Sequence, residues 1–396
     1  MADRQRQYDR EERKLKKEKK RKIILWSVFG VLTLILVIMR VSEININSVI
    51  DRFTDENGKF SLTDGVTDDN FPYSIDSSKN VILTNVNNRL GVLTPSSFTV
   101  INASDGNAEY VFDHGYSNPV IDKSGVYTIV YDQGAKSFRL DTTSSAVYQK
   151  TTENQILCAT VNKKGIAAIA ENISAKHCSI NVYNTSLETI FSKNISDGYI
   201  VDMALSANGK KLAVIKLGSV DASLDITAYV YKITTGELLG TVKLPQGSLV
   251  DIRYNGDSLY TIGDSYVGVV KNDSEYEEVL KAGTVSNVCF DYSPSGELVI
   301  VHSEFDNSNS NVCSVISSSG KIKTDVNISG SVRDISASSS RITVLTTNEI
   351  LSFSYRGQEK GSADSNDTVK SICTIGNRVL RHRQTIIEKS EVSLDN

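Results

Sequence analysis

Beyond residue 70, hydrophobic and polar positions alternate in short runs, and no long segment shows helical spacing. The runs are rich in β-branched and aromatic residues, and Gly, Asn, Asp and Ser separate them. Alternation of this kind, broken by turn-forming residues, is typical of short strands joined by tight turns. The pattern therefore predicts an all-β domain over residues 71–392.

The strand pattern repeats along the chain. "VDMALSANGKKLAVIKLG" from Val201 and "NVCFDYSPSGELVIVHSE" from Asn287 both read as an alternating strand, a turn ending in glycine (Gly209, Gly296) and an apolar strand. Each unit continues with a third strand and a second turn, as in "TAYVYKITTGELLGTVKL". The first strands begin near Val81, Asn118, Ile156, Val201, Val250, Asn287, Val332 and Val369. Their mean spacing is about 41 residues.

Four short strands in about 40 residues is the period of a β-propeller blade. One four-stranded sheet cannot bury both faces alone, whereas a ring of stacked blades buries them all. We therefore predict a propeller of eight four-stranded blades, with seven blades as the alternative and a β-sandwich array as a more distant one. The unit from Val369 offers only three strands, so "FPYSID" from Phe71 is expected to supply the fourth and close the ring.

A different pattern precedes this domain. From Ile23 to Met39 the chain carries no charge, and a helix of this length measures roughly 25 Å against a ~30 Å hydrocarbon core. Arg40 lengthens the segment by extending its guanidinium to the head groups, and Trp26 lies where an interfacial indole is favoured. We predict a transmembrane helix over 23–40.

The charges around this helix predict its orientation. Residues 1–22 contain eleven Lys/Arg against five Asp/Glu, ending in the cluster Lys19, Lys20, Arg21 and Lys22. This asymmetry predicts a cytoplasmic basic tail (1–22), an acidic linker (41–70) and an extracytoplasmic domain. A cleaved signal peptide is disfavoured because no small-x-small site follows the apolar block. A nucleic-acid arm would need no apolar helix directly behind it.

The composition gives the sign of the net charge of the domain. Removing the first 40 residues leaves 31 basic and 42 acidic residues, so the remainder is acidic and nucleic acid is not an expected partner. The expected partners are the lipid bilayer and a protein or cell-envelope polymer outside the membrane. The five cysteines contain no C-x-x-C pair and are interpreted as buried thiols, with one or two disulfides left open.

Motifs for catalysis or metal binding are missing from the sequence. The four histidines lack metal-ligand spacing, and neither a G-x-S-x-G elbow nor a P-loop occurs, so we predict no catalytic residues, metal or cofactor. One constellation stands out, because aligning the first strands places Asp202, Asp251 and Asp334 near one position, with Asn118 near it in another unit. In a propeller this position lines the central channel. The aspartates are candidates for binding a cation or basic group there, or for hydrogen bonding to blade-to-blade backbone or channel water.

The basic N-terminus, the single apolar helix and repeats such as "SANGKKLAVI" and "KITTGELLG" together resemble a family of uncharacterised clostridial single-pass membrane proteins, a domain of unknown function. The resemblance implies a WD40-like or quinoprotein-like propeller and a Gram-positive host, but no activity. Two departures matter. The chain lacks Gly-His and Trp-Asp pairs, so it is not expected to be a eukaryotic-type WD40 protein. Its single tryptophan, Trp26, lies in the apolar block, and this argues against a quinone cofactor.

These observations favour a membrane-anchored extracytoplasmic propeller that acts as a binding or scaffold module. The alternative is an extracytoplasmic hydrolase or lyase that uses carboxylates at the channel mouth. A transmembrane sensor is a third hypothesis, although a 22-residue tail is too short to fold and would need a partner for signalling.

Overall fold

A computed structural model describes residues 70–392, except 175–176, 221–222, 282–284 and 305–309. All regular secondary structure in this part of the chain is β-strand, and the strands form eight four-stranded antiparallel sheets. The predicted tail (1–22), transmembrane helix (23–40) and linker (41–70) lie outside the described residues, apart from Asn70. Within those residues, no helix is long and apolar enough to span a bilayer.

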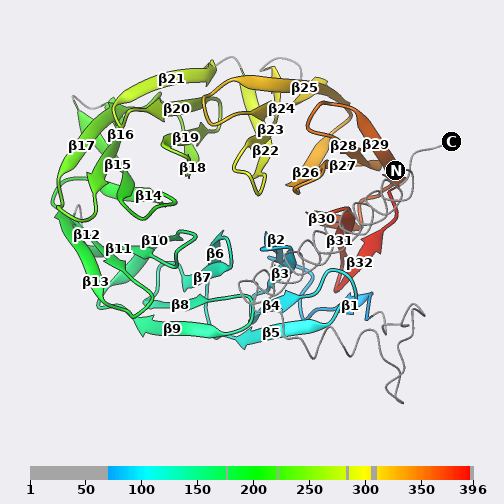
Figure 1. Ribbon diagram of the computed structural model, residues 1–396, viewed down its shortest axis with the longest axis horizontal. Coiled ribbons are helices and arrows are strands. Elements are labelled where there is room, and N and C mark those ends of the chain that lie inside the picture. The colour runs from blue at the N-terminus through cyan, green and yellow to red at the C-terminus, as the bar shows by residue number, and fades with distance from the viewer. Residues whose placement is uncertain (1–69, 175–176, 221–222, 282–284, 305–309, 393–396) are drawn as a thin grey trace, which may run out of the picture. The chain divides into compact units, whose positions relative to one another are not determined.

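The eight sheets are the blades of a propeller, and seven of them use four consecutive strands (Figure 1). Blade 1 contains β2 (Ile82–Val86), β3 (Arg89–Leu93), β4 (Ser97–Ile101) and β5 (Ala108–Asp113), and blade 2 contains β6 (Pro119–Ser124), β7 (Tyr127–Asp132), β8 (Ser137–Asp141) and β9 (Ala146–Thr151). Blade 3 contains β10 (Gln155–Val161), β11 (Ala167–Ser174), β12 (His177–Tyr183) and β13 (Thr189–Ile195), and blade 4 contains β14 (Tyr199–Leu205), β15 (Lys211–Val220), β16 (Ser223–Lys232) and β17 (Leu238–Lys243). Blade 5 contains β18 (Leu249–Asn255), β19 (Ser258–Gly263), β20 (Val267–Lys271) and β21 (Glu275–Leu280), and blade 6 contains β22 (Val285–Tyr292), β23 (Leu298–Glu304), β24 (Ser310–Ile316) and β25 (Ile322–Ser329). Blade 7 contains β26 (Val332–Ala337), β27 (Ile342–Thr346), β28 (Glu349–Phe353) and β29 (Glu359–Asp364), and blade 8 contains β30 (Val369–Ile375), β31 (Arg378–Arg383), β32 (Ile386–Ser390) and β1 (Tyr73–Ser74).

The last blade closes the ring with a strand from the start of the domain. β1 pairs antiparallel with β32, with Tyr73 opposite Ile387 and Ser74 opposite Ile386. The strand predicted within "FPYSID" therefore completes blade 8, and the prediction of eight blades rather than seven is confirmed. Blade 8 therefore combines strands from both ends of the domain, which closes the ring.

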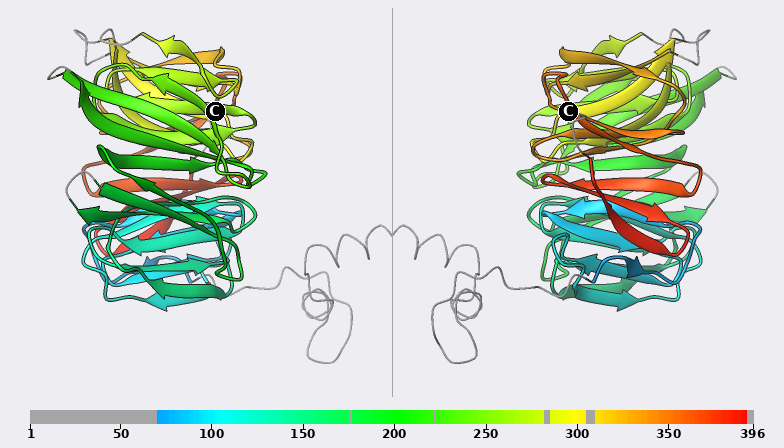
Figure 2. Two further views of the ribbon diagram at one scale, coloured as in Figure 1. Left: turned by 90° about the vertical axis from the view of Figure 1, so that its left-hand side faces the viewer. Right: turned by 90° about the vertical axis from the view of Figure 1, so that its right-hand side faces the viewer.

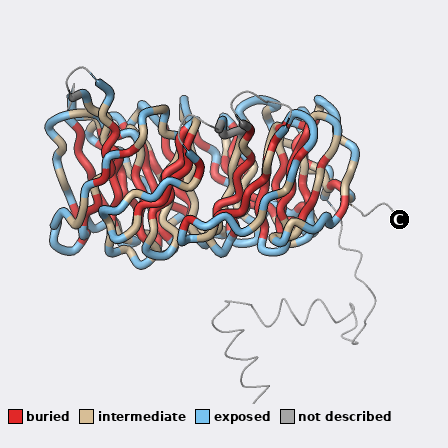
Figure 3. Tube along the Cα trace, turned by 90° about the horizontal axis from the view of Figure 1, so that it is seen from above, coloured by how far each residue is buried: buried red, intermediate tan, exposed pale blue. Residues whose placement is uncertain are grey.

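The core consists of eight hydrophobic clusters, one at each junction between neighbouring blades. At the junction of blades 3 and 4, for example, Ile180 and Val182 of β12 pack with Leu212 and Val214 of β15. At the closing junction, Leu90 and Val92 of blade 1 pack with Leu380 and Ile387 of blade 8. Seen edge-on, the buried residues follow the strands, and the exposed residues gather in the turns at the two faces (Figure 3). Each blade gains its stability from its neighbours, as the repeat pattern predicts.

The topology defines two faces of the propeller, seen edge-on in Figure 2. The innermost strand of every blade begins at one face, here called the mouth face, because all blades share the same strand order. The chain enters at the opposite face, where the Asn70 N–H donates to the Asp105 carbonyl in the β4–β5 turn at 2.7 Å. Lys389, near the end of β32, donates to the Ser104 carbonyl on that same opposite face. Asn70 and Lys389 therefore both lie at the face opposite the mouth face.

Candidate functional site

The inner strands of six blades carry a register shift near the mouth face. In each case the chain inserts one extra residue, so the strand kinks and turns the next side chain toward the channel. The residues that follow the shift are Cys158, Asp202, Asp251, Cys289, Asp334 and Ser371. Three of the four residues singled out by sequence alignment thus occupy one structural position, in blades 4, 5 and 7.

The fourth residue, Asn118, lies elsewhere. It precedes β6, whose pairing with β7 shows no register shift, and its side chain is exposed. Its backbone N–H donates to Asp132 Oδ1 at 2.8 Å. Asn118 therefore caps the start of blade 2 and does not join the aspartates.

Asp202 and Asp334 each connect their blade to the next one. Asp202 Oδ1 accepts from the N–H of Met203 at 2.8 Å, and its Oδ2 accepts from the N–H of Ile252 in blade 5 at 3.1 Å. Asp334 repeats this arrangement, with Ile335 at 2.9 Å and Ile372 in blade 8 at 2.8 Å. Carboxylates suit this place because the innermost strand is the edge of its sheet, and each carboxylate oxygen accepts a backbone N–H there.

A second set of links lies deeper in the channel, two residues further along the inner strands. Asp291 Oδ2 accepts from the N–H of Ala337 at 2.8 Å, and Ser336 Oγ accepts from the N–H of Thr374 at 2.8 Å. Asp122 Oδ2 accepts from both Thr160 Oγ1 and the N–H of Val161 in blade 3. Sequence reasoning missed Asp122 and Asp291. The available signal was an acidic residue at the same step of "VIDKSG" and "CFDYSPSG".

Asp251 is held differently, by a side chain instead of backbone. Its Oδ2 accepts from Tyr292 Oη of blade 6 at 2.5 Å. The guanidinium of Arg253 lies over the Tyr292 ring, 4.7 Å from its centroid, and its Nη2 donates to the Lys123 carbonyl of blade 2 at 2.7 Å. Lys123 Nζ in turn donates to the Asn85 carbonyl of blade 1 at 2.9 Å. Arg253 thus crosses the channel from blade 5 to blade 2, and Lys123 links blade 2 to its neighbour, blade 1.

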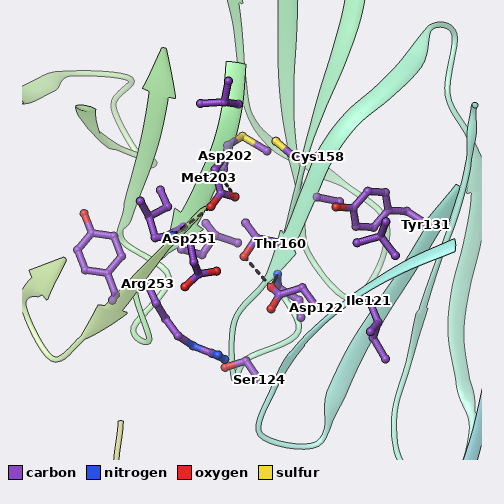
Figure 4. Close-up of a pocket in the computed structure, with 18 of the residues that line it drawn as sticks. Ile121, Asp122, Ser124, Tyr131, Cys158, Thr160, Asp202, Met203, Asp251 and Arg253 are labelled. Atoms are coloured by element: carbon purple, nitrogen blue, oxygen red, sulfur yellow. Dashed lines mark hydrogen bonds between the residues drawn. The ribbon is translucent and has the colours of Figure 1, made fainter. Parts of the chain in front are cut away.

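Blades 2 to 5 enclose a cavity of about 330 Å³ on their side of the channel (Figure 4). Asp122, Asp202 and Asp251 line it, whereas Asp334 and Asn118 do not. Arg253 is the one basic residue among its lining residues. The cavity therefore contains more acidic than basic groups.

Removal from water shifts the titration of these aspartates. Desolvation raises the pKa of Asp202 well above its ordinary range, and the neighbouring Asp251 raises it further. Desolvation also raises the pKa of Asp251 to about 6, although the Tyr292 hydrogen bond opposes the shift. The pKa of Asp334 is raised to about 7, again chiefly by desolvation. Carboxyl groups that titrate near neutral pH can exchange protons or respond to an added cation.

The other candidate chemistry is sparse. Within residues 70–392 and outside the gaps, no cluster of three or more His, Cys, Asp and Glu side chains has the geometry to hold a metal ion. All five cysteines are free thiols, four of them buried, which leaves no disulfide in this chain. The prediction of buried thiols is confirmed for these four residues, and Cys289 is only partly buried.

Comparison with solved structures shows a common fold at low sequence identity. A computationally designed protein, Ika8, shares 10% identity, with a TM-score of 0.58 over 81% of this chain and 98% of that chain. The C-terminal WD40 domain of Sif2 shares 12% identity, with a TM-score of 0.56 over 82% of this chain and 98% of the other. Apo AztD from Citrobacter koseri shares 13% identity, with a TM-score of 0.54 over 78% and 95%.

These similarities support the WD40-like propeller fold and carry no information on activity. No curated protein sequence matches this chain. A family of unknown function, DUF5711, matches residues 72–393, which is the whole propeller. The chain therefore belongs to DUF5711.

Proposed function

We propose that this protein is a membrane-anchored binding module whose propeller works outside the cytoplasmic membrane of a Gram-positive, clostridial-type bacterium. The anchor rests on the uncharged segment from Ile23 to Met39 and the basic cluster before it. The partner is a protein or polymer of the cell envelope. The acidic charge of the domain makes nucleic acid a poor candidate.

One observation carries the binding hypothesis: three carboxylates of the channel link neighbouring blades and so hold the ring together. Asp202, Asp291 and Asp334 each accept a backbone N–H from the following blade. Arg253 then spans the channel between blades 5 and 2. A fixed scaffold of this kind supports recognition at its faces, where loops from all eight blades surround the mouth.

A second candidate function is an extracytoplasmic hydrolase or lyase. It is favoured by the proximity of Asp202 and Asp251 in a cavity, where their raised pKa values fit acid–base work. Against it, both oxygens of Asp202 accept main-chain hydrogen bonds, which restrict proton transfer to substrate. Release of reducing ends or unsaturated sugars from isolated cell walls, abolished in Asp251→Asn, would establish the enzyme and overturn the binding module.

The test of anchoring compares the full-length chain with a variant that lacks residues 1–40, both expressed in the host. The full-length protein should stay in membranes after an alkaline wash, and a membrane-impermeant reagent should label its propeller lysines on intact cells. The truncated variant should be lost from the membrane fraction. Recovery of the full-length protein in the cytosol, or labelling only after lysis, would overturn the proposed location.

The partner test uses cross-linking on intact cells followed by membrane extraction. The full-length protein should capture the same envelope component in repeated experiments, and the variant without residues 1–40 should capture less of it. Recovery of only the proteins found with an unrelated single-pass membrane protein would argue against the binding module.

A further inference from the structure

The mouth of the cavity in blades 2 to 5 has an apolar rim. The rim consists of Val120, Val201 and Val250, which line the cavity near the starts of β6, β14 and β18. Val201 and Val250 expose 39% and 52% of their surfaces. Both are the extra residues of their register shifts, so the strand kink that aims Asp202 and Asp251 into the channel also turns these valines outward.

The groups behind the rim retain unused acceptor capacity. Within the described residues, Oδ1 of Asp122 and Oδ1 of Asp251 accept no hydrogen bond, while the second oxygen of each is engaged. The basic side chain of Arg253 is already committed to the Lys123 carbonyl. An added basic group would therefore meet two carboxylate oxygens that accept no hydrogen bond within the described residues, in a cavity lined by three aspartates and one arginine.

The size of the site is also suitable for a ligand. About 330 Å³ lies at the lower end of the range for small-molecule pockets, and is far more than a few bound waters need. A single long side chain fits such a space, and its neighbours along an extended chain would lie against the valines. The rim lies at the mouth face, opposite the β4–β5 turn that Asn70 and Lys389 contact.

Building on the proposed function, we propose that this rim docks a segment of an envelope protein, which inserts one basic side chain between two apolar neighbours into the carboxylate-lined cavity. The apolar neighbours cover Val120, Val201 and Val250, and the basic group binds Asp122 and Asp251. Charge complementarity selects this occupant, because a neutral or acidic segment would leave the free carboxylate oxygens unpaired.

The probe is the tripeptide acetyl-Ile-Arg-Ile-amide, and its matched control replaces arginine with citrulline, which keeps the shape and removes the charge. Isothermal titration calorimetry, with the arginine peptide titrated into the full-length protein, should show saturable binding. The citrulline peptide should bind at least about tenfold more weakly. Equal affinities, or no binding of the arginine peptide at millimolar concentration, would overturn the proposal.

Two variants locate the site without disturbing the core. Val250→Lys places a positive charge on the rim and should weaken binding of the arginine peptide at least about tenfold. Leu238→Lys makes the same change at a residue that is 48% exposed at the start of β17, on the opposite face, and should leave binding unchanged. Thermal unfolding of both variants checks that they are folded. Equal effects of the two substitutions would contradict the assigned position.

Other outcomes point elsewhere. If the protein elutes as a dimer that the arginine peptide does not dissociate, and Val250→Lys makes it a monomer, the rim is an interface between two copies and the peptide proposal is wrong. Failure of peptide binding in a protein that is membrane-anchored and captures a partner would refute only this inference. Cytosolic recovery would refute the proposed location whatever the peptide does.

Discussion

Arg253 of blade 5 reaches across the channel and donates from Nη2 to the carbonyl oxygen of Lys123 in blade 2, at 2.7 Å. The two residues are 130 positions apart in the sequence, and the bond joins blades that are not neighbours in the ring. The positive charge of Arg253 also lies among Asp122, Asp251 and Asp291, which raise its pKa against the opposing effect of desolvation. Arg253 therefore ties the ring across its centre and balances part of its acidity.

Replacing this arginine should weaken the whole ring. Arg253→Met removes the bond to Lys123 and the counter-charge for Asp251, so we expect the free energy of unfolding to fall by about 3 kcal/mol. Arg253→Lys keeps the charge but loses the planar guanidinium over Tyr292. Its free energy of unfolding should therefore lie between those of Arg253→Met and the unsubstituted protein. Denaturant unfolding of the full-length chain measures both. Parent-like stability of Arg253→Met would show that the cross-channel bond contributes nothing.

The hydroxyl of Tyr292 should stabilise the folded protein, whereas the hydroxyl of Tyr254 should not. Tyr292→Phe leaves Asp251 Oδ2 without its donor, so we expect a loss of ~1–3 kcal/mol. Tyr254 provides the control, since its buried hydroxyl has no hydrogen-bond partner in the described structure. Tyr254→Phe should be neutral or slightly stabilising. Thermal unfolding of the two variants side by side decides the matter, and a larger loss in Tyr254→Phe would contradict this assignment.

The closing contact between β1 and β32 should carry a measurable part of the stability. Ile387 is fully buried and pairs with Tyr73, so Ile387→Ala should cost ~2–5 kcal/mol through lost contacts and a cavity. The matched control is Ile322→Ala, at a residue that is 42% exposed at the start of β25. This substitution should change the free energy of unfolding by less than about 0.5 kcal/mol. Limited proteolysis should cut the Ile387→Ala protein faster. Equal cleavage of both variants would mean that blade 8 does not depend on this contact.

The contribution of the channel carboxyls to stability should fall as pH rises through the neutral range. The folded-state pKa values of Asp251 and Asp334 are raised to about 6 and about 7, above the unfolded value of 3.8. Between pH 4 and 7 these two carboxyls therefore bind more protons in the folded protein than in the unfolded chain, and their contribution to the free energy of unfolding decreases with increasing pH.

Other charged groups around these two carboxyls modulate the effect. Asp122, Asp202, Arg253 and Tyr292 face Asp251, and Asp291 and Arg333 face Asp334. Denaturant unfolding at several pH values, on the full-length protein and on Asp334→Asn, measures the slope. The variant should show a shallower decrease between pH 5 and 8. An unchanged slope would exclude Asp334 as a contributor.

The thiols should be unreactive in the native protein. Desolvation raises the pKa values of Cys313 and Cys373 to about 12, and that of Cys158 well above its ordinary value, so little reactive thiolate forms at neutral pH. A thiol reagent should modify the folded chain slowly, with Cys289 the most accessible, and all five cysteines after denaturation. Rapid native modification of Cys158 would contradict its burial.

The sequence alone determined the architecture of this domain. Alternation, turn glycines such as Gly209 and Gly296, and a period near 41 residues predicted eight four-stranded blades and the closing strand near Tyr73, because these features reflect local backbone preferences and short-range strand pairing. The same alignment brought Asp202, Asp251 and Asp334 to one register position.

Only the tertiary structure decided what those aspartates contact. The partner of Asp202 is a backbone N–H some fifty residues later, whereas that of Asp251 is a tyrosine hydroxyl, and Arg253 finds its acceptor across the ring. Alignment also could not remove Asn118 from the set, since its strand lacks the register shift. The physical reason is that a channel is made by closing the ring. Its contacts depend on which blades face one another and on how each inner strand is kinked, and neither is encoded in a local pattern.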